Sequence, residues 1–208
     1  MENLLSEIVQ EVVSRVKKEV FIEVEASGRH VHLSEEDVDK LFGKGYTLTK
    51  LRDLSQPGQY ACKERVTITG PKGSIKNVIV LGPCRKETQV EVSLTDGSTL
   101  GLKPPIKQSG DLENTLGVKI STEKGEIELK KGLMVAKRHI HMSVEDAKKF
   151  DVSDNEVVEV KVFGKRPLIF DDVVVRVNDN FKTYMHIDYD EANACAHSKG
   201  TMAKIIKR

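Results

Sequence analysis

The sequence has no tryptophan, and aromatic residues make up only 5% of its 208 positions. Aromatic platforms on which nucleic-acid bases stack are therefore not expected. An excess of charge is also absent, because 33 Lys and Arg residues oppose 32 Asp and Glu residues for a net charge of +1. This balance argues against a nucleic-acid or membrane-surface partner, which would require a basic excess. No apolar run approaches about 18 residues, so no segment is expected to span a membrane.

Cysteine is scarce as well. The three cysteines, Cys62, Cys84 and Cys195, are widely spaced and odd in number. They form neither a disulfide framework nor a CxxC metal-binding motif. This use of cysteine favours a reducing, cytoplasmic location. The first 20 residues contain Glu2 and Glu7 and no continuous apolar run, so they do not predict a secretory signal.

Short segments rich in valine and isoleucine alternate after residue 20 with turn signals such as Asp96-Gly97, which predicts strands. Two short helices are expected at residues 35–42 and 144–150, where Ser34 and Ser143 can act as N-caps. Many short strands with few helices predict a mainly β protein built from small barrels or sandwiches. The expected strands are residues 21–26, 65–69, 76–81, 88–93, 118–121, 126–129, 156–162, 172–177 and 182–187.

Residues 1–20 have a different pattern, with apolar residues at spacings of three and four. This periodicity predicts an amphipathic helix. Such a helix could either pack on its own domain or dock on another protein.

The sequence contains an internal repeat. Residues 29–40 read RHVHLSEEDVDK and residues 138–149 read RHIHMSVEDAKK, with Arg, His, His, Ser, Glu, Asp and Lys at a constant offset. Residues 88–92, TQVEV, align with residues 183–187, TYMHI, if one insertion or deletion is allowed between the two blocks. Two copies of one unit predict two similar β domains, with a boundary near Lys137.

Each repeat opens with a His-x-His motif. Side chains two positions apart on an extended segment share one face, so two imidazoles can converge on one metal ion. The aligned strands add a glutamate in one copy and a histidine in the other, and both can bind a metal. Three protein ligands with an open position are typical of catalytic zinc. The alternatives are histidines that only cap strands, or purely structural zinc sites. The two predicted sites are His30, His32 and Glu91, and His139, His141 and His186.

Two loops carry positive charge. Residues 82–86, GPCRK, precede the strand that holds Glu91, and Arg85 offers a planar fork for phosphate. This string could also be an ordinary solvated hairpin turn. Residues 103–111, KPPIKQSGD, are stiffened by two prolines and carry two lysines. They form either a linker between domains or a wall of the site that meets phosphate or a nucleotide tail.

The strings SGRHVHLSEEDVDKLFG, VLGPCRKETQVEVSLTDG, PPIKQSGDL and KRHIHMSVEDA together resemble the PduL-type phosphotransacylases, which are phosphate propanoyl- or acetyltransferases. The resemblance extends from about residue 21 to residue 206. It implies two β-barrels capped by short helices, with the active site between them. The first barrel would be residues 29–136, and the second would be residues 137–208, completed by the strand at 21–28.

The activity implied by the resemblance is the reversible reaction of propanoyl- or acetyl-CoA with phosphate to give acyl phosphate and CoA. It implies two Zn²⁺ ions in the predicted sites, for which another divalent ion such as Co²⁺ could substitute. Arg85 would be the catalytic residue that binds phosphate. Residues 1–20 would package the protein in a bacterial microcompartment by binding shell or core proteins.

We also expect a homo-oligomer, located in the cytoplasm or inside such a compartment. Two other functions remain open from the sequence. One is a dinuclear zinc hydrolase of a thioester or phosphoester, which would release CoA without phosphate. The other is a zinc-stabilised scaffold that docks through residues 1–20 and does not depend on Arg85.

Overall fold

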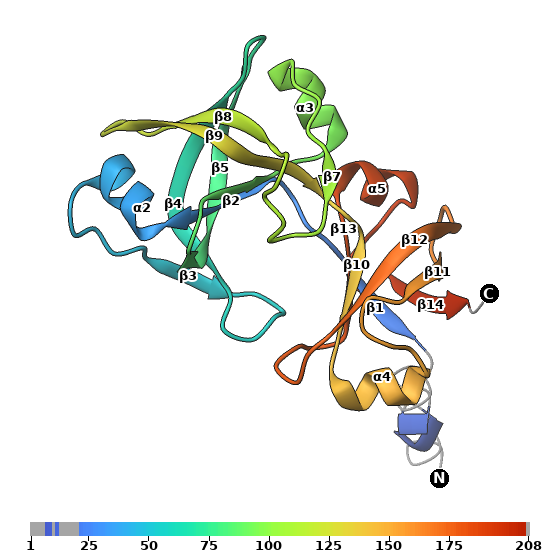
Figure 1. Ribbon diagram of the computed structural model, residues 1–208. Helices are drawn as coiled ribbons and strands as arrows, with labels where there is room; N and C mark the ends of the chain where they lie inside the picture. The colour runs from blue at the N-terminus through green and yellow to red at the C-terminus, as the bar shows by residue number, and fades with distance from the viewer. Residues whose placement is uncertain (1–6, 10, 13–20, 207–208) are drawn as a thin grey trace. The chain divides into compact units, whose positions relative to one another are not determined.

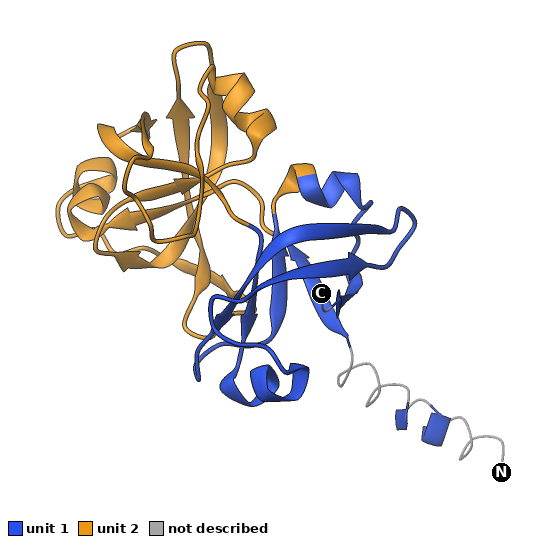
Figure 2. Ribbon diagram, turned by 45° about the vertical axis from the view of Figure 1, so that its right-hand side comes forward, with its two compact units in different colours: residues 1–26, 138–187, 191–208 blue, residues 27–137, 188–190 orange. Residues whose placement is uncertain are grey.

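A computed structural model describes residues 7–9, 11–12 and 21–206 of the chain (Figure 1). Contacts divide the chain into two compact units (Figure 2). Unit 1 comprises Met1–Ala26, Arg138–Ile187 and Glu191–Arg208, and unit 2 comprises Ser27–Lys137 and Asp188–Asp190.

The N-terminal helix expected over residues 1–20 lies mostly outside the described residues. Residues 7–9 and 11–12 are helical and exposed, and they include Ile8, Val9 and Val12. Among the described helices, none is both long enough and apolar enough to cross a membrane.

Unit 2 is a closed barrel of six strands with two more strands at its edges. The order around the barrel is β4, β5, β2, β6, β9 and β8, and β8 pairs again with β4. The strands are β2 (His30–Ser34), β3 (Lys50–Asp53), β4 (Tyr60–Thr69), β5 (Ser74–Arg85), β6 (Gln89–Glu91), β7 (Ile106–Lys107), β8 (Leu116–Ser121) and β9 (Glu126–Ala136). The helices are α2 (Glu35–Phe42) and α3 (Leu94–Leu100).

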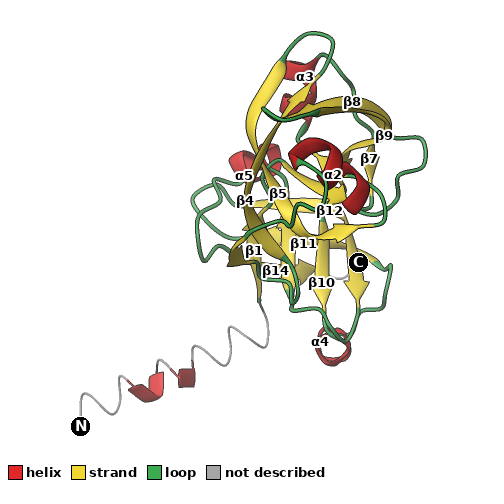
Figure 3. Ribbon diagram, turned by 90° about the vertical axis from the view of Figure 1, so that its left-hand side faces the viewer, coloured by secondary structure: helices red, strands yellow, loops and turns green. Residues whose placement is uncertain are grey.

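Unit 1 is a second closed barrel, with the strand order β1, β13, β10, β12, β11 and β14. Its strands are β1 (Ile22–Ala26), β10 (His139–Met142), β11 (Val157–Val162), β12 (Leu168–Val177), β13 (Tyr184–Ile187) and β14 (Met202–Ile206). Helix α4 (Val144–Phe150) follows β10, and α5 (Tyr189–Ala194) follows β13. Strands and loops dominate the described chain and the helices are short, so the mainly β prediction of two small barrels is confirmed (Figure 3).

The residue between the two histidines of each motif fills the core of its barrel. In unit 2, Val31 on β2 lies opposite Val80 on β5 and Val90 on β6, and all three are fully buried. In unit 1, Ile140 on β10 lies opposite Val175 and Met185, which are also fully buried. Since successive side chains of a strand alternate between faces, the flanking histidines lie on the other face of the sheet.

The helices after the two His-x-His strands begin as the sequence predicts. The Ser34 hydroxyl accepts a hydrogen bond from the Asp37 N–H, and the Ser143 hydroxyl accepts one from the Asp146 N–H. These side chains satisfy a backbone donor that the first turn would otherwise leave unpaired. The two predicted helices are therefore confirmed at their expected bounds.

The expectation that only two short helices follow residue 20 is wrong. Helix α3 covers a segment that includes Asp96 and Gly97, which we interpreted as a turn. A capping box starts this helix, because Ser93 and Asp96 each accept a hydrogen bond from the other's backbone N–H. Gly97 inside this helix disfavours helix formation, and an Asp-Gly pair is typical of a turn. Helix α5 has only six residues and shows no clear apolar period.

Candidate functional site

The first group of predicted ligands, which we call site A, consists of His30, His32 and Glu91. Both histidines lie on β2, and Glu91 lies on β6, directly opposite His30 in the antiparallel register. One candidate ligand atom from each residue lies within 4.8 Å of the others. All three side chains are buried in unit 2. The strand pairing thus brings together residues that are far apart in the sequence.

The hydrogen bonds of His30 suit a metal ligand. Its Nδ1 lies 2.8 Å from the Gly28 carbonyl oxygen, and its Nε2 lies 3.5 Å from Oε2 of Glu91. Since a carbonyl can only accept, the contact favours a proton on Nδ1 and leaves Nε2 for a metal ion. Burial opposes the charged form of His30, but the Glu91 carboxylate raises its pKa above the usual value.

His32 has a different environment. Burial and the neighbouring charge of His30 hold the pKa of His32 well below its usual value, so this imidazole is neutral. Its Nδ1 is buried and has no hydrogen-bond partner among the described residues. Buried polar atoms of this kind are rare in folded proteins unless a ligand or water satisfies them. A neutral, buried imidazole beside a carboxylate therefore fits a divalent metal such as zinc.

Glu91 is fixed by two neutral donors. Gln89 Nε2 and Ser109 Oγ both donate to its Oε1, the latter over 2.8 Å, while Oε2 faces His30. Burial disfavours the carboxylate, but the neighbouring His30 and His32 and the hydrogen bond from Ser109 lower the pKa of Glu91 well below its usual value. Glu91 therefore stays ionised, which a metal ligand requires.

Arg85 lies at the end of β5 and joins the same network. Its Nη1 donates to Ser109 Oγ over 3.3 Å, and the Gly110 N–H donates to Gln89 Oε1 over 2.9 Å. The loop at residues 103–111 thus contacts site A within unit 2, which favours its interpretation as a wall of the site over that of a linker. The roles of Gln89 and Ser109 were not predicted from the sequence, although the spacing of Gln89 and Glu91 on one strand face is a usable signal.

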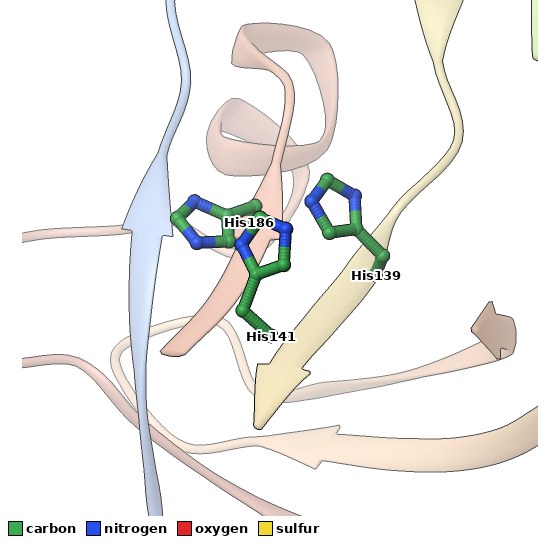
Figure 4. Close-up of side chains that lie close together, drawn as sticks. All are labelled: His139, His141 and His186. Atoms are coloured by element: carbon green, nitrogen blue, oxygen red, sulfur yellow. The ribbon is translucent and has the colours of Figure 1, made fainter. Parts of the chain in front are cut away.

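The second group, which we call site B, consists of His139, His141 and His186. Figure 4 shows the three imidazoles gathered over β10 and β13. His139 lies directly opposite His186, and the three ring centroids are 4.6–5.2 Å apart. One nitrogen from each ring lies within 4.8 Å of the others. All three ligands are imidazoles, a donor type that suits zinc.

Two residues that are not predicted ligands contact the histidines of site B. Nδ1 of His186 lies 3.7 Å from Oε2 of Glu25 on β1, the neighbouring strand. Carboxylates in this position orient metal-bound imidazoles and raise their basicity. The ring of Phe181 lies 4.3 Å from that of His141, between centroids, and adds an apolar wall. The remaining histidine, His197, belongs to neither group and contacts the Val24 carbonyl oxygen through Nε2 at 2.8 Å.

Comparison with known proteins identifies the family. A family model described as phosphate propanoyltransferase matches residues 23–198, which include both sites and Arg85. The chain belongs to the phosphate propanoyltransferase family. The resemblance seen in the sequence is therefore confirmed, and so is the prediction of a phosphate acyltransferase enzyme.

Three curated proteins named phosphate propanoyltransferase illustrate the similarity. The protein of Clostridioides difficile (strain 630) is 82% identical over 208 residues and covers 100% of both chains. That of Listeria monocytogenes serovar 1/2a is 58% identical over 205 residues, 99% of this chain and 96% of the relative. That of Thermotoga maritima is 52% identical over 200 residues, 96% of this chain and 95% of the relative. The similarity to phosphate propanoyltransferases thus extends over nearly the whole chain.

Proposed function

We propose that the protein is a zinc-dependent phosphate acyltransferase that reversibly transfers a propanoyl or acetyl group between CoA and phosphate. The observation that supports this proposal most directly is the pair of three-ligand groups at equivalent positions of two similar barrels. A second support is the guanidinium of Arg85, which hydrogen-bonds to the network around Glu91. The family names agree with this reaction class.

We propose that His30, His32 and Glu91 hold one Zn²⁺ and that His139, His141 and His186 hold another. Bound zinc supplies a Lewis acid that stabilises negative charge on oxygen or on a thiolate sulfur. The carboxylate of Glu91 would offset one positive charge in site A, whereas the neutral imidazoles of site B would offset none. On this basis site A suits the CoA sulfur and site B suits an oxyanion or a phosphate oxygen.

The chain itself has to hold the phosphate and direct it to the thioester. Arg85 can bind two phosphate oxygens at once because its guanidinium is a planar fork. Ser109 restricts the guanidinium by accepting its hydrogen bond. Holding two reactants in line removes much of the entropic part of the barrier.

The reaction then balances without an oxidant or an acyl-enzyme. An oxygen of HPO₄²⁻ attacks the thioester carbonyl, a C–O bond forms and the C–S bond breaks. The proton of the phosphate ends on the CoA thiol. Cys84 adjoins Arg85, but burial raises the pKa of its thiol, which makes it a poor nucleophile at neutral pH. Direct attack by phosphate is therefore the simpler route.

A CoA-release assay tests this function. Acetyl-, propanoyl- and butanoyl-CoA are supplied with and without phosphate, and acyl phosphate is measured alongside free thiol. The proposal predicts thiol release only with phosphate, in equal amount to acyl phosphate, and its loss after treatment with a chelator. Thiol release without phosphate would instead identify a thioester hydrolase, and unchanged rates after complete metal removal would exclude the zinc proposal.

We also propose that residues 1–20 dock on shell or core proteins of a bacterial microcompartment. Three apolar side chains in the described part of this segment, Ile8, Val9 and Val12, are each more than half exposed. An apolar helix face of this kind suits a groove on a partner. Fusion of residues 1–20 to a fluorescent protein should direct it into microcompartments of a host that makes them. A diffuse signal, equal to that of a fusion with Ile8, Val9 and Val12 changed to Ser, would contradict this proposal.

A further inference from the structure

An arginine directly precedes each His-x-His strand. Its side chain contacts the helix that follows the third predicted ligand, Glu91 or His186, along the chain. In unit 2, Nε of Arg29 donates to Oδ2 of Asp96 over 3.0 Å, and its Nη2 lies 2.8 Å from Oδ1. Asp96 lies in α3, the helix that follows β6 and Glu91. The side chain of Asp96 is only 7% exposed, so this two-point ion pair is partly shielded from solvent.

Unit 1 has a similar arrangement with different residues, although its arginine contacts the carboxylate through one nitrogen and donates through Nε to the Asp171 carbonyl oxygen over 2.7 Å. Arg138 precedes β10, and its Nη1 lies 2.6 Å from Oε1 of Glu191. Glu191 lies in α5, the helix that follows β13 and His186. The acidic residue stands at the same distance along the chain from the third ligand in both units. Asp96 and Glu191 thus have the same role, which is to form an ion pair with the arginine that precedes the His-x-His strand. Both lie in helices outside the repeated sequence motifs.

A second contact stabilises the other end of each strand pair, β2 with β6 and β10 with β13. The Thr88 hydroxyl, just before β6, donates to Oδ2 of Asp37 in α2, the helix that follows β2. The Thr183 hydroxyl, just before β13, donates to Oδ2 of Asp146 in α4, the helix that follows β10. Because the paired strands run antiparallel, the arginine contact and the threonine contact lie at opposite ends of each pair.

These contacts act on two short strands. Strand β6 has three residues and β13 has four, so few ladder hydrogen bonds fix their register. A shift by one residue would turn the third ligand to the opposite face of the sheet. Exposed ion pairs add little to stability by themselves. Their repetition at both metal-ligand strand pairs, with a buried carboxylate in unit 2, points to a role in placing the ligands.

We propose that Arg29 with Asp96 and Arg138 with Glu191 are positioning pairs. Each holds the third ligand opposite the His-x-His motif of its own unit and so sets that site's affinity for a divalent metal. The threonine contacts secure the same strands from the other end. This inference rests on the metal sites of the proposed function and deepens it.

The test measures the two sites one at a time in the full chain. The double variant His139→Ala/His141→Ala retains site A, and His30→Ala/His32→Ala retains site B. Into each background Arg29→Met or Arg138→Met is introduced, and Co²⁺ is titrated by absorbance with Zn²⁺ competition. Arg29→Met should weaken site A about tenfold or more, the range seen when contacts beyond the metal ligands are removed, and leave site B within twofold. Arg138→Met should weaken metal binding at site B by a similar factor and leave the affinity of site A within twofold.

The controls separate positioning from general destabilisation. Lys119→Met removes another ion pair of unit 2, with Glu126 at 2.7 Å, and should change neither affinity. Arg29→Lys keeps the charge but not the two-point contact and should recover part of the affinity. If either methionine variant does not fold, Thr88→Val or Thr183→Val replaces it, with the same site-specific loss expected.

Two results have distinct meanings. If a background with one intact site binds no metal, the metal part of the proposed function fails. If both backgrounds bind metal but each arginine variant leaves the affinity of its own site unchanged, or weakens both sites equally, the positioning inference is overturned.

Discussion

Removing the Ser109 hydroxyl is expected to slow the reaction without altering any metal ligand. Ser109 donates to Glu91 and accepts from Arg85 and Gln89. Hydrogen bonds to charged groups contribute about 1.5–3 kcal/mol each. Gln89 still donates to Glu91 in Ser109→Ala, and the Arg85 contact is long at 3.3 Å, which reduces the loss. We therefore expect a cost of about 2 kcal/mol, equivalent to about 30-fold in kcat/KM.

Steady-state kinetics with phosphate and acyl-CoA varied separately measure this effect. Because Ser109 restrains Arg85, kcat/KM for phosphate should fall more than KM for acyl-CoA rises. The matched control is Ser98→Ala on α3, where the hydroxyl donates only to the Leu94 carbonyl among the described contacts. A Ser109→Ala enzyme with kcat/KM for phosphate within twofold of the parent would refute the reasoning.

Three further changes test other parts of the account. Cys84→Ala should keep near-normal turnover, and loss of activity with intact metal content would support an acyl-enzyme. Ile140→Val should lower the free energy of unfolding by about 1 kcal/mol in denaturant, with metal content unchanged; loss of metal would show that core packing controls site B. Burial opposes ionisation of Glu64, but hydrogen bonds from backbone N–H groups and the Tyr46 hydroxyl lower its pKa. The ionised Glu64 therefore stabilises the folded protein at pH values above its usual pKa of 4.5. This stabilisation is lost as the pH falls through the lower pKa that Glu64 has in the folded state. Glu64→Gln should therefore lower Tm more at pH 7 than at pH 3; an equal loss at both would contradict this.

The repeat made the candidate ligands predictable from the sequence. Its histidines share one strand face, and the residue between them is apolar in both copies, Val31 and Ile140, as a buried barrel strand requires. The alignment of Glu91 with His186 needed only the order of residues along two strands. These features are local, so they are visible without a structure.

The parts that were missed depend on long-range contacts or on short segments. Strand β3 has four exposed residues and therefore no alternation of apolar and polar positions. The loop at residues 103–111 was one candidate wall of the site, but no local pattern indicates that Ser109 within it donates to Glu91. Asp96 with Gly97 predicts a turn, and the contact of Asp96 with Arg29 is invisible in the sequence because the two residues lie far apart.

The most direct test of the account is the metal content of the full chain, measured by inductively coupled plasma mass spectrometry. We predict two zinc equivalents for the parent, and one each for His32→Ala/Glu91→Ala and His139→Ala/His186→Ala, with phosphate-dependent thiol release lost in both variants. A parent that turns over with no bound divalent metal, or variants that retain two equivalents, would contradict the central claim that these six side chains form two metal sites.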